Sequence, residues 1–149
     1  MKKLLAIGTL ACSSWFSNAA FAQDISGVWQ QIDDQTGSGR ALIEISKMPD
    51  GSYSGKIVKV TPREGYTPRA TCKDCPSPYT NQPILGLSVL NNLKMQNDTN
   101  YEKGRILDPL TGKMYDARAK VNKAGNRLTL RGYMGVSALG RSQTWIRQQ

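Results

Sequence analysis

Apolar side chains recur at every second position over much of the chain, which is the spacing of β-strands that bury one face. Ala41, Ile43 and Ile45 fall on one face of such a strand. A Pro-Asp-Gly turn at 49–51 then leads into a second strand over 53–60. Proline, aspartate and glycine favour tight turns for separate conformational reasons, so this stretch predicts a β-hairpin.

The second half of the chain repeats this arrangement. Residues 104–107 lead through an Asp-Pro turn at 108–112 into a strand over 114–121, and a turn at 122–126 leads into a strand over 128–134. One face of the 114–121 strand is apolar or aromatic and the other is charged, so we expect it to be half solvated. We count about eight strands in all, at the spacing of an all-β sandwich or barrel.

The final stretch, 128–147, predicts how the sheet closes. Leu128 and Leu130 alternate with polar residues, and Thr144-Trp145-Ile146 is β-branched and aromatic. The aromatic residue lies close to an arginine on this last strand, and Gly27-Val28-Trp29 offers a complementary glycine and indole on the first. We therefore expect the first and last strands to meet in the seam of a small antiparallel up-and-down β-barrel.

Two segments do not fit the alternation. The apolar run over 84–93 is too short for periodicity to separate a buried strand from a helix. We predict a strand through Val89 and a turn or helical cap at Asn91-Asn92. Residues 61–83 contain five prolines and no usable period. A loop of this length within a compact domain is usually functional or disordered.

The N-terminus has the pattern of a secretory signal. Lys2 and Lys3 precede an apolar run over 4–11, and Ala20-Phe21-Ala22 provides small residues for cleavage. We expect a signal peptide over 1–22 and a single mature domain over 23–149. A membrane anchor is the first alternative, but the apolar run falls short of the roughly 20 residues that cross a bilayer. A lipoprotein signal ending at Cys12 is the second, and its preceding residues fit less well.

The chain is basic, with a formal net charge of +9. Loss of Lys2 and Lys3 would leave 18 basic and 11 acidic residues, or +7. The basic residues gather in the long loop and along the hairpin near the C-terminus: Arg63, Arg69 and Lys73, and Arg118, Lys120, Lys123, Arg127 and Arg131. A solvated face is the usual explanation, and contact with anionic lipid or lipopolysaccharide is the alternative. Nucleic acid fits poorly, because no surface aromatic residues interleave with the basic ones.

No catalytic arrangement is evident in the sequence. The chain has no histidine, which excludes Ser-His-Asp and Cys-His nucleophiles and imidazole metal ligands. The carboxylates are scattered, and the glycines fall in turns between strands rather than before a helix. We therefore predict a protein that is not an enzyme and carries no cofactor or metal.

Cys72 and Cys75 form the one potentially reactive motif. Two thiols at this spacing can form a disulfide, supply half a zinc site or exchange thiols. The zinc site lacks a second ligand pair, and Pro76 and Pro78 follow where a redox motif needs a helix. Because exported proteins meet oxidising conditions, we favour a structural disulfide that stiffens the long loop, with redox activity as the alternative.

Several short motifs occur together in one order along the chain. They are Gly27-Val28-Trp29, Cys72-Lys73-Asp74-Cys75, Pro83-Ile84-Leu85-Gly86-Leu87, Ile106-Leu107-Asp108-Pro109 with Gly112-Lys113-Met114-Tyr115, Arg131-Gly132-Tyr133, and the block from Leu139 to Trp145. Together they resemble the bacterial exported family catalogued as domain of unknown function 2147. That resemblance implies a lipocalin-like β-barrel, similar also to fatty-acid-binding proteins, and supplies no function.

A lipocalin-like fold implies a role for the residues at the seam. Gly27 and Trp29 resemble the first-strand lipocalin signature, in which the indole closes one end of the barrel and an arginine near the last strand lies over it. Arg147 is the first candidate for that arginine and Arg141 the second. The alternative is that Trp29 and Trp145 are ordinary core aromatic residues.

We therefore expect an exported binding module, periplasmic or secreted, that carries or senses a small apolar or amphipathic ligand such as a lipid or fatty acid. Residues 61–83 would form its lid. The side chains expected to line the cavity follow from alternation: Tyr53, Ile57, Tyr115, Ala117, Leu128, Leu130 and Tyr133. The alternatives are a filled-core envelope protein that acts through its basic face, and a thiol redox protein that uses Cys72 and Cys75.

Overall fold

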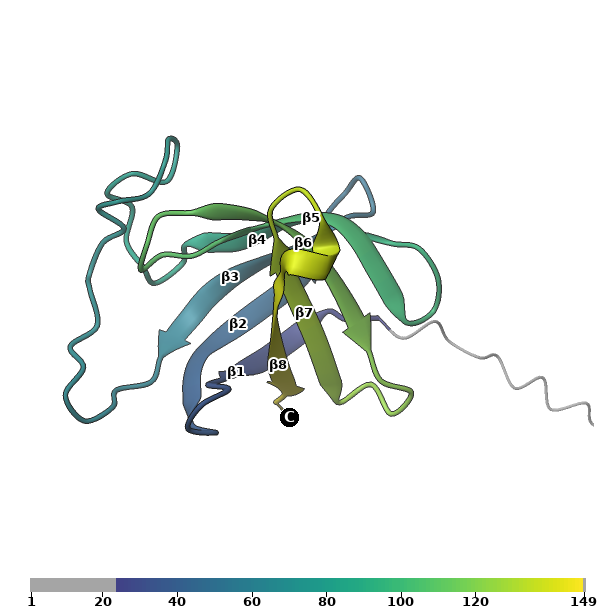
Figure 1. Cartoon of the computed structure of the whole chain (residues 1–149), viewed down its shortest axis with the longest axis horizontal. Helices are drawn as coiled ribbons and strands as arrows, with labels where there is room; N and C mark the ends of the chain where they lie inside the picture. Colours follow the sequence, from purple (N-terminus) through teal and green to yellow (C-terminus); the bar gives the residue numbers. More distant parts are fainter. Residues whose placement is uncertain (1–23, 149) are drawn as a thin grey trace, which may run out of the picture.

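The computed structural model describes residues 24–148 as a closed antiparallel β-barrel in which each strand pairs with the next and the last pairs with the first (Figure 1). This confirms the fold class predicted from alternation. The elements are β1 (Gly27–Ile32), β2 (Gly39–Lys47), β3 (Tyr53–Val60), β4 (Ser88–Met95), β5 (Asn100–Leu107), β6 (Met114–Val121), β7 (Arg127–Tyr133), the short 3₁₀ helix η1 (Ser137–Leu139) and β8 (Arg141–Arg147).

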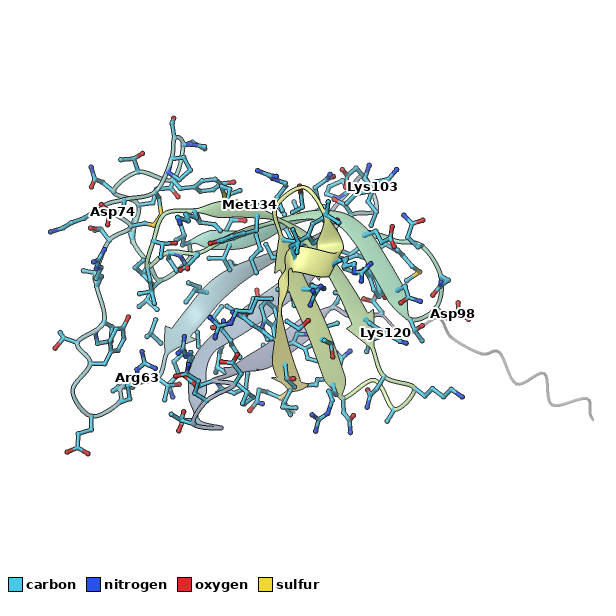
Figure 2. The ribbon with its side chains drawn as sticks, in the orientation of Figure 1. Arg63, Asp74, Asp98, Lys103, Lys120 and Met134 are labelled. Atoms are coloured by element: carbon cyan, nitrogen blue, oxygen red, sulfur yellow. A yellow bond between two sulfur atoms is a disulfide. The ribbon has the colours of Figure 1, made fainter. Side chains whose placement is uncertain are left out.

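Up-and-down pairing sorts the connections between two ends of the barrel. The β1–β2, β3–β4, β5–β6 and β7–β8 connections lie at one end, which we call the open end. The other three connections lie at the closed end, together with the start of β1. Figure 2 shows this separation, because Asp74 of the β3–β4 connection and Asp98 of the β4–β5 connection lie on opposite sides of the barrel.

Large side chains fill the closed end. Trp29 and Tyr101 are fully buried, and Tyr53 is 1% exposed. The rings of Tyr53 and Tyr101 meet edge to face, with centroids 5.4 Å apart and planes at 85°. Aliphatic residues from neighbouring strands complete this part of the core: Ile25, Ile45, Leu93 and Leu128. Dense packing of aromatic and branched side chains therefore plugs this end.

The predicted turn at Asn91-Asn92 is wrong, because β4 runs through both residues. Leu90 pairs with Gly55 and Leu93 pairs with Tyr53, so three steps along β4 match two along β3. Asn92 takes up the extra residue with φ of 57°. Such a bulge shifts the alternation, which lets both Leu90 and Leu93 face the core.

The β3–β4 connection covers residues 61–87. Residues 61–83 form a loop as predicted, tied down at several points, whereas the strand predicted through Val89 from the apolar run at 84 begins only at Ser88. Cys72 and Cys75 form a disulfide, and both are buried. The amide of Cys72 donates to the carbonyl of Gln82 at 2.9 Å. The disulfide turn also abuts the β5–β6 turn, where a Cβ on Gly112, at φ of +72°, would overlap the carbonyl of Asp74. The connection is thus fastened across the open end.

The predicted signal peptide, residues 1–22, and its cleavage site lie outside the described residues. Between residues 24 and 148, no helix has the length and apolar character needed to span a bilayer.

Candidate functional site

A cavity of about 730 Å³ occupies the open end of the barrel. Its volume falls in the range of roughly 300–1,000 Å³ that small-molecule pockets occupy. Aliphatic side chains of several strands and of the β3–β4 connection make its apolar walls: Ala41, Ile57, Val60, Ile84, Ile106, Leu107 and Leu130. Gly132 on β7 and the rings of Tyr66, Tyr115 and Tyr133 also lie in its wall.

The side chains predicted to line a cavity divide into two groups. Ile57, Leu130, Tyr115 and Tyr133 lie in its wall. The other three predictions are wrong about position: Tyr53, Ala117 and Leu128 are buried but belong to the packed core and do not line the cavity. Alternation determines which side chains of a strand point inward. Whether an inward side chain lies at the cavity or in the packed core depends on its position along the barrel axis, which follows from strand tilt and from the size of the neighbouring side chains.

Two glutamines mark the boundary between the cavity and the packed core. The Gln31 Nε2 donates to Gln143 Oε1 at 2.8 Å, and the indole Nε1 of Trp145 donates to the same oxygen at 3.3 Å. Trp145 itself is 1% exposed. Sequence reasoning missed these glutamines, although each lies two residues from an inward tryptophan and therefore shares its face.

A buried carboxylate, Asp33, organises the mouth of the cavity. Its Oδ2 accepts hydrogen bonds from Arg40 Nε at 2.6 Å and from Arg63 Nη1 at 3.4 Å. Its Oδ1 accepts from the amides of Gln35 and Thr36 at 2.8 and 3.1 Å. The amide of Gln35, followed by Arg40, lowers the pKa of Asp33 to about 2. The group therefore stays ionised and holds Arg40 in place.

Arg63 differs from the other mouth arginines in its contacts. Arg69 pairs with Asp74 at 3.0 Å, whereas the contact from Arg63 to Asp33 is 3.4 Å. The Arg63 guanidinium also lies 4.5 Å from the centroid of the Tyr66 ring, in cation–π contact. Its side chain is 36% exposed and lines the cavity. Arg63 is thus oriented by its neighbours while part of it still faces the cavity.

Arg141, the second candidate for the seam, lies instead at the open end. Its Nη2 is 3.0 Å from both carboxylate oxygens of Asp34. This bond holds the pKa of Asp34 below its usual range and joins the start of β8 to the β1–β2 connection. The assignment of Arg141 to the seam is therefore wrong.

Arg147, the first candidate, lies over Trp29 at the closed end, with its guanidinium carbon 4.4 Å from the ring centroid. It also donates to three backbone carbonyls at 2.6–2.8 Å, those of Asp24, Ser26 and Gly125. Gly27 has φ of +131°, and a Cβ there would lie 2.9 Å from Arg147 Nη1. The glycine thus leaves room for the guanidinium, and the contacts of Arg147 are structural.

The basic residues predicted along the C-terminal hairpin do not line this cavity. Arg118 and Lys120 lie on β6, and they are exposed together with Lys123 and Arg127. Arg131 is half-buried and bonds to the β7–β8 connection. Over residues 24–148, no group of three histidine, cysteine or acidic side chains is placed to hold a metal ion.

Comparison with known proteins agrees with this architecture. Protein HP1028 from the human pathogen Helicobacter pylori, described as belonging to the lipocalin family, has a similar fold with a TM-score of 0.71 at 20% sequence identity, over 85% of this chain and 84% of that one. No curated protein matches the sequence. The family described as "Uncharacterized protein conserved in bacteria (DUF2147)" matches residues 27–147, and this chain therefore belongs to that family.

Proposed function

We propose that the protein is an exported bacterial binding protein that carries a small amphipathic ligand such as a fatty acid. The apolar part of the ligand lies among the aliphatic walls of the cavity, and its anionic head lies at the mouth beside Arg63. The protein acts by binding and release and catalyses no reaction.

The observation that carries this proposal is the cavity of about 730 Å³ with apolar walls and arginines at its mouth. A filled barrel has no such space, which separates this proposal from a purely structural role. Small barrels that enclose one ligand use the same division, with apolar walls for affinity and a few polar groups for orientation. Reduced water contact of the apolar tail supplies the driving force.

The chemistry of the mouth supports an anionic head group. Guanidinium groups bind carboxylate and phosphate oxygens through paired N–H donors. Arg40 is engaged by Asp33, and Arg141 is engaged by Asp34. Arg63 has the longest carboxylate contact among these mouth residues and is positioned by Tyr66. It is therefore the residue to which we assign recognition of the head.

One feature of the sequence and one of the structure support export. The first 22 residues have the charge, apolar run and small residues of a secretory signal. Cys72 and Cys75 form a disulfide, a bond that persists in oxidising compartments outside the cytoplasm. The absence of histidine from the chain argues against the common nucleophilic mechanisms.

Native mass spectrometry tests the proposal directly. The mature chain, residues 23–149, is purified without detergent from the envelope of a bacterial host, and the bound mass is identified after solvent extraction. We expect a reproducible lipid or fatty acid. A protein that stays bare after incubation with host lipid extract would contradict the carrier function.

A cavity-filling variant tests the location of the ligand. Gly132 lines the cavity, and a Cβ there would lie 3.5 Å from its nearest neighbour, so a phenylalanine would extend into the void without backbone strain. We expect Gly132→Phe to lower the affinity for a fluorescent fatty acid by about tenfold, which corresponds to about 1.4 kcal/mol of binding free energy. Thr129→Phe, on the outer face of the same strand, should leave the affinity within about twofold. Equal affinity for both variants and the wild type would place the ligand elsewhere.

Arg63→Gln tests the head group. We expect this variant to lose about tenfold in affinity for a long-chain carboxylate, because a charged hydrogen bond contributes about 1.5–3 kcal/mol. Affinity for the matching uncharged alcohol should change little. Arg118→Gln removes the same charge from the outer wall and serves as the control. Equal losses for the acid and the alcohol would argue against a role for Arg63 in recognising charge.

A further inference from the structure

The β7–β8 connection, residues 134–140, carries three of the most exposed large apolar side chains in the described part of the chain. Leu139 is 84% exposed, Val136 59% and Met134 58%. Figure 1 shows this connection and η1 in yellow, in front of the ribbons of β5 and β6, and Figure 2 labels Met134 at its start. Exposed apolar side chains scattered singly are ordinary, but three on one short segment indicate an interaction site.

Contacts with β7 and β8 hold the connection in place. Arg131 on β7 donates to Ser142 Oγ at 2.9 Å and to the carbonyl of Ala138 at 3.2 Å. A Cβ on Gly140 would lie 2.5 Å from the carbonyl of Gly132, so the backbone packs directly on β7 there. These contacts hold the connection against β7 and β8, while its three large apolar side chains stay exposed.

The exposed side chains are continuous with the cavity. Met134 and Leu139 are also part of the cavity wall, as is Leu110 of the β5–β6 connection, which is 42% exposed. An apolar path therefore runs from the cavity to the outside of the open end. Elsewhere on the described surface, Leu85 of the β3–β4 connection is 63% exposed, and Met48, Val58 and Met95 are 37–41% exposed. None of these four side chains lines the cavity.

The shape and charge of this surface fit a lipid bilayer better than another protein. The exposed apolar groups belong to one short segment, and a stable protein interface needs about 800 Å² per partner. An exposed apolar segment can enter the boundary between lipid head groups and acyl chains without a matching groove. The expected mature chain, without Lys2 and Lys3, has a formal net charge of +7, which attracts it to anionic lipid.

We infer that the β7–β8 connection docks the open end of the barrel on an anionic membrane surface. Met134, Val136 and Leu139 enter the interfacial region, and the mouth of the cavity then faces the lipid head groups. Transfer of a ligand between bilayer and cavity rests on the proposed function, whereas docking itself does not.

A reporter variant tests insertion. Trp29 and Trp145 are at most 1% exposed, so we expect their fluorescence to change little when the protein binds lipid. We expect the fluorescence of Leu139→Trp in the mature chain to shift to the blue on vesicles of phosphatidylethanolamine and phosphatidylglycerol. Lipids brominated on their acyl chains should quench it. Vesicles of phosphatidylcholine alone should bind less protein, because they carry no net charge.

Matched triple variants test the surface itself. The first variant combines Met134→Ser, Val136→Ser and Leu139→Ser. Its affinity for the anionic vesicles, measured by co-sedimentation, should fall by about tenfold or more. The control variant combines Met48→Ser, Val58→Ser and Met95→Ser, which removes three exposed apolar groups elsewhere. Its affinity for the vesicles should stay within about twofold of the wild type. Melting curves of both variants establish that each is folded.

Three results would overturn docking through this connection: no binding of the wild type to anionic vesicles, equal losses in both triple variants, or a wild-type dimer that the β7–β8 variant converts to a monomer. The last result would assign the surface to a second copy of the chain. Binding of a soluble fatty acid without vesicle binding contradicts docking alone. Vesicle binding by a protein that takes up no fatty acid contradicts the proposed function alone.

Discussion

The two ends of the barrel are made from the same strands but differ in how fully their side chains fill the interior. At the closed end, Trp29, Tyr53 and Tyr101 fill the interior and are at most 1% exposed. At the open end, aliphatic residues, Gly132 and three tyrosines surround a cavity of about 730 Å³. Packing that stabilises the fold is therefore concentrated at one end, which leaves space for a ligand at the other.

The arginines differ between the ends in the same way. Arg147 donates to three backbone carbonyls, which are fixed parts of the fold. Arg40, Arg63 and Arg141 meet carboxylates around a cavity that solvent can enter. Asp34, the partner of Arg141, is 45% exposed, and an ion pair exposed to this degree contributes little to stability. Substitutions at the two ends should therefore have unequal consequences for folding.

The largest difference should come from aromatic truncation. We expect Trp29→Ala to lower the free energy of unfolding by about 3–5 kcal/mol, because the fully buried indole leaves a cavity that its neighbours cannot fill. Tyr133→Ala, at the wall of the existing cavity, should cost less than half as much, since Tyr133 is only partly buried. Urea unfolding of both variants measures this. Equal losses of unfolding free energy would contradict the inference that the closed end contributes more to stability than the open end.

The strands that bury one face were the most predictable part of the molecule. In β6, Ala117, Ala119 and Val121 face inward as alternation requires, because a two-residue period leaves no other choice. The contact of Arg147 with Trp29 followed from the family resemblance rather than from the pattern. The bulge at Asn92 was not predictable, because an asparagine pair in a polar setting also favours a turn, and the choice depends on pairing with β3.

The mouth was the least predictable part. Asp33 looks like an ordinary turn residue in the sequence, and it does bond to the turn amides of Gln35 and Thr36. Its charged partners Arg40 and Arg63 are 7 and 30 residues away, and the pairing of β2 with both β1 and β3 brings them together. Long-range contacts of this kind leave no periodic signal in a single sequence.

A smaller effect on folding should come from the arginine at the seam. We expect Arg147→Met to lower the free energy of unfolding by about 2 kcal/mol, because it removes charged hydrogen bonds and a cation–π contact while keeping an apolar stem over Trp29. Arg141→Met, which breaks an exposed pair at the mouth, should cost less than about 1 kcal/mol. Urea unfolding at neutral pH compares the two, and a costlier Arg141 variant would contradict the structural ranking of the ends.

The smallest of the three effects should come from Asp33→Asn, because asparagine keeps an oxygen that can accept the amide hydrogen bonds of Gln35 and Thr36. The variant loses the charge and the oxygen that accepts from Arg40 and Arg63. The pKa of Asp33 is lowered from 3.8 to about 2 in the folded protein, so its ionised form contributes stability above the unfolded value. That contribution is lost as pH falls toward the folded value.

The difference in unfolding free energy between wild type and Asp33→Asn should therefore be largest near neutral pH and shrink between about pH 4 and pH 2. Urea midpoints for both proteins over this range measure it, and the other carboxylates titrate in both proteins and largely cancel in the difference. A difference that stays constant down to pH 2 would mean that the charge of Asp33 does not stabilise the fold. In that case the carboxylate would serve only to position Arg40 and Arg63 at the mouth, and the open end would contribute still less to stability than its contacts suggest.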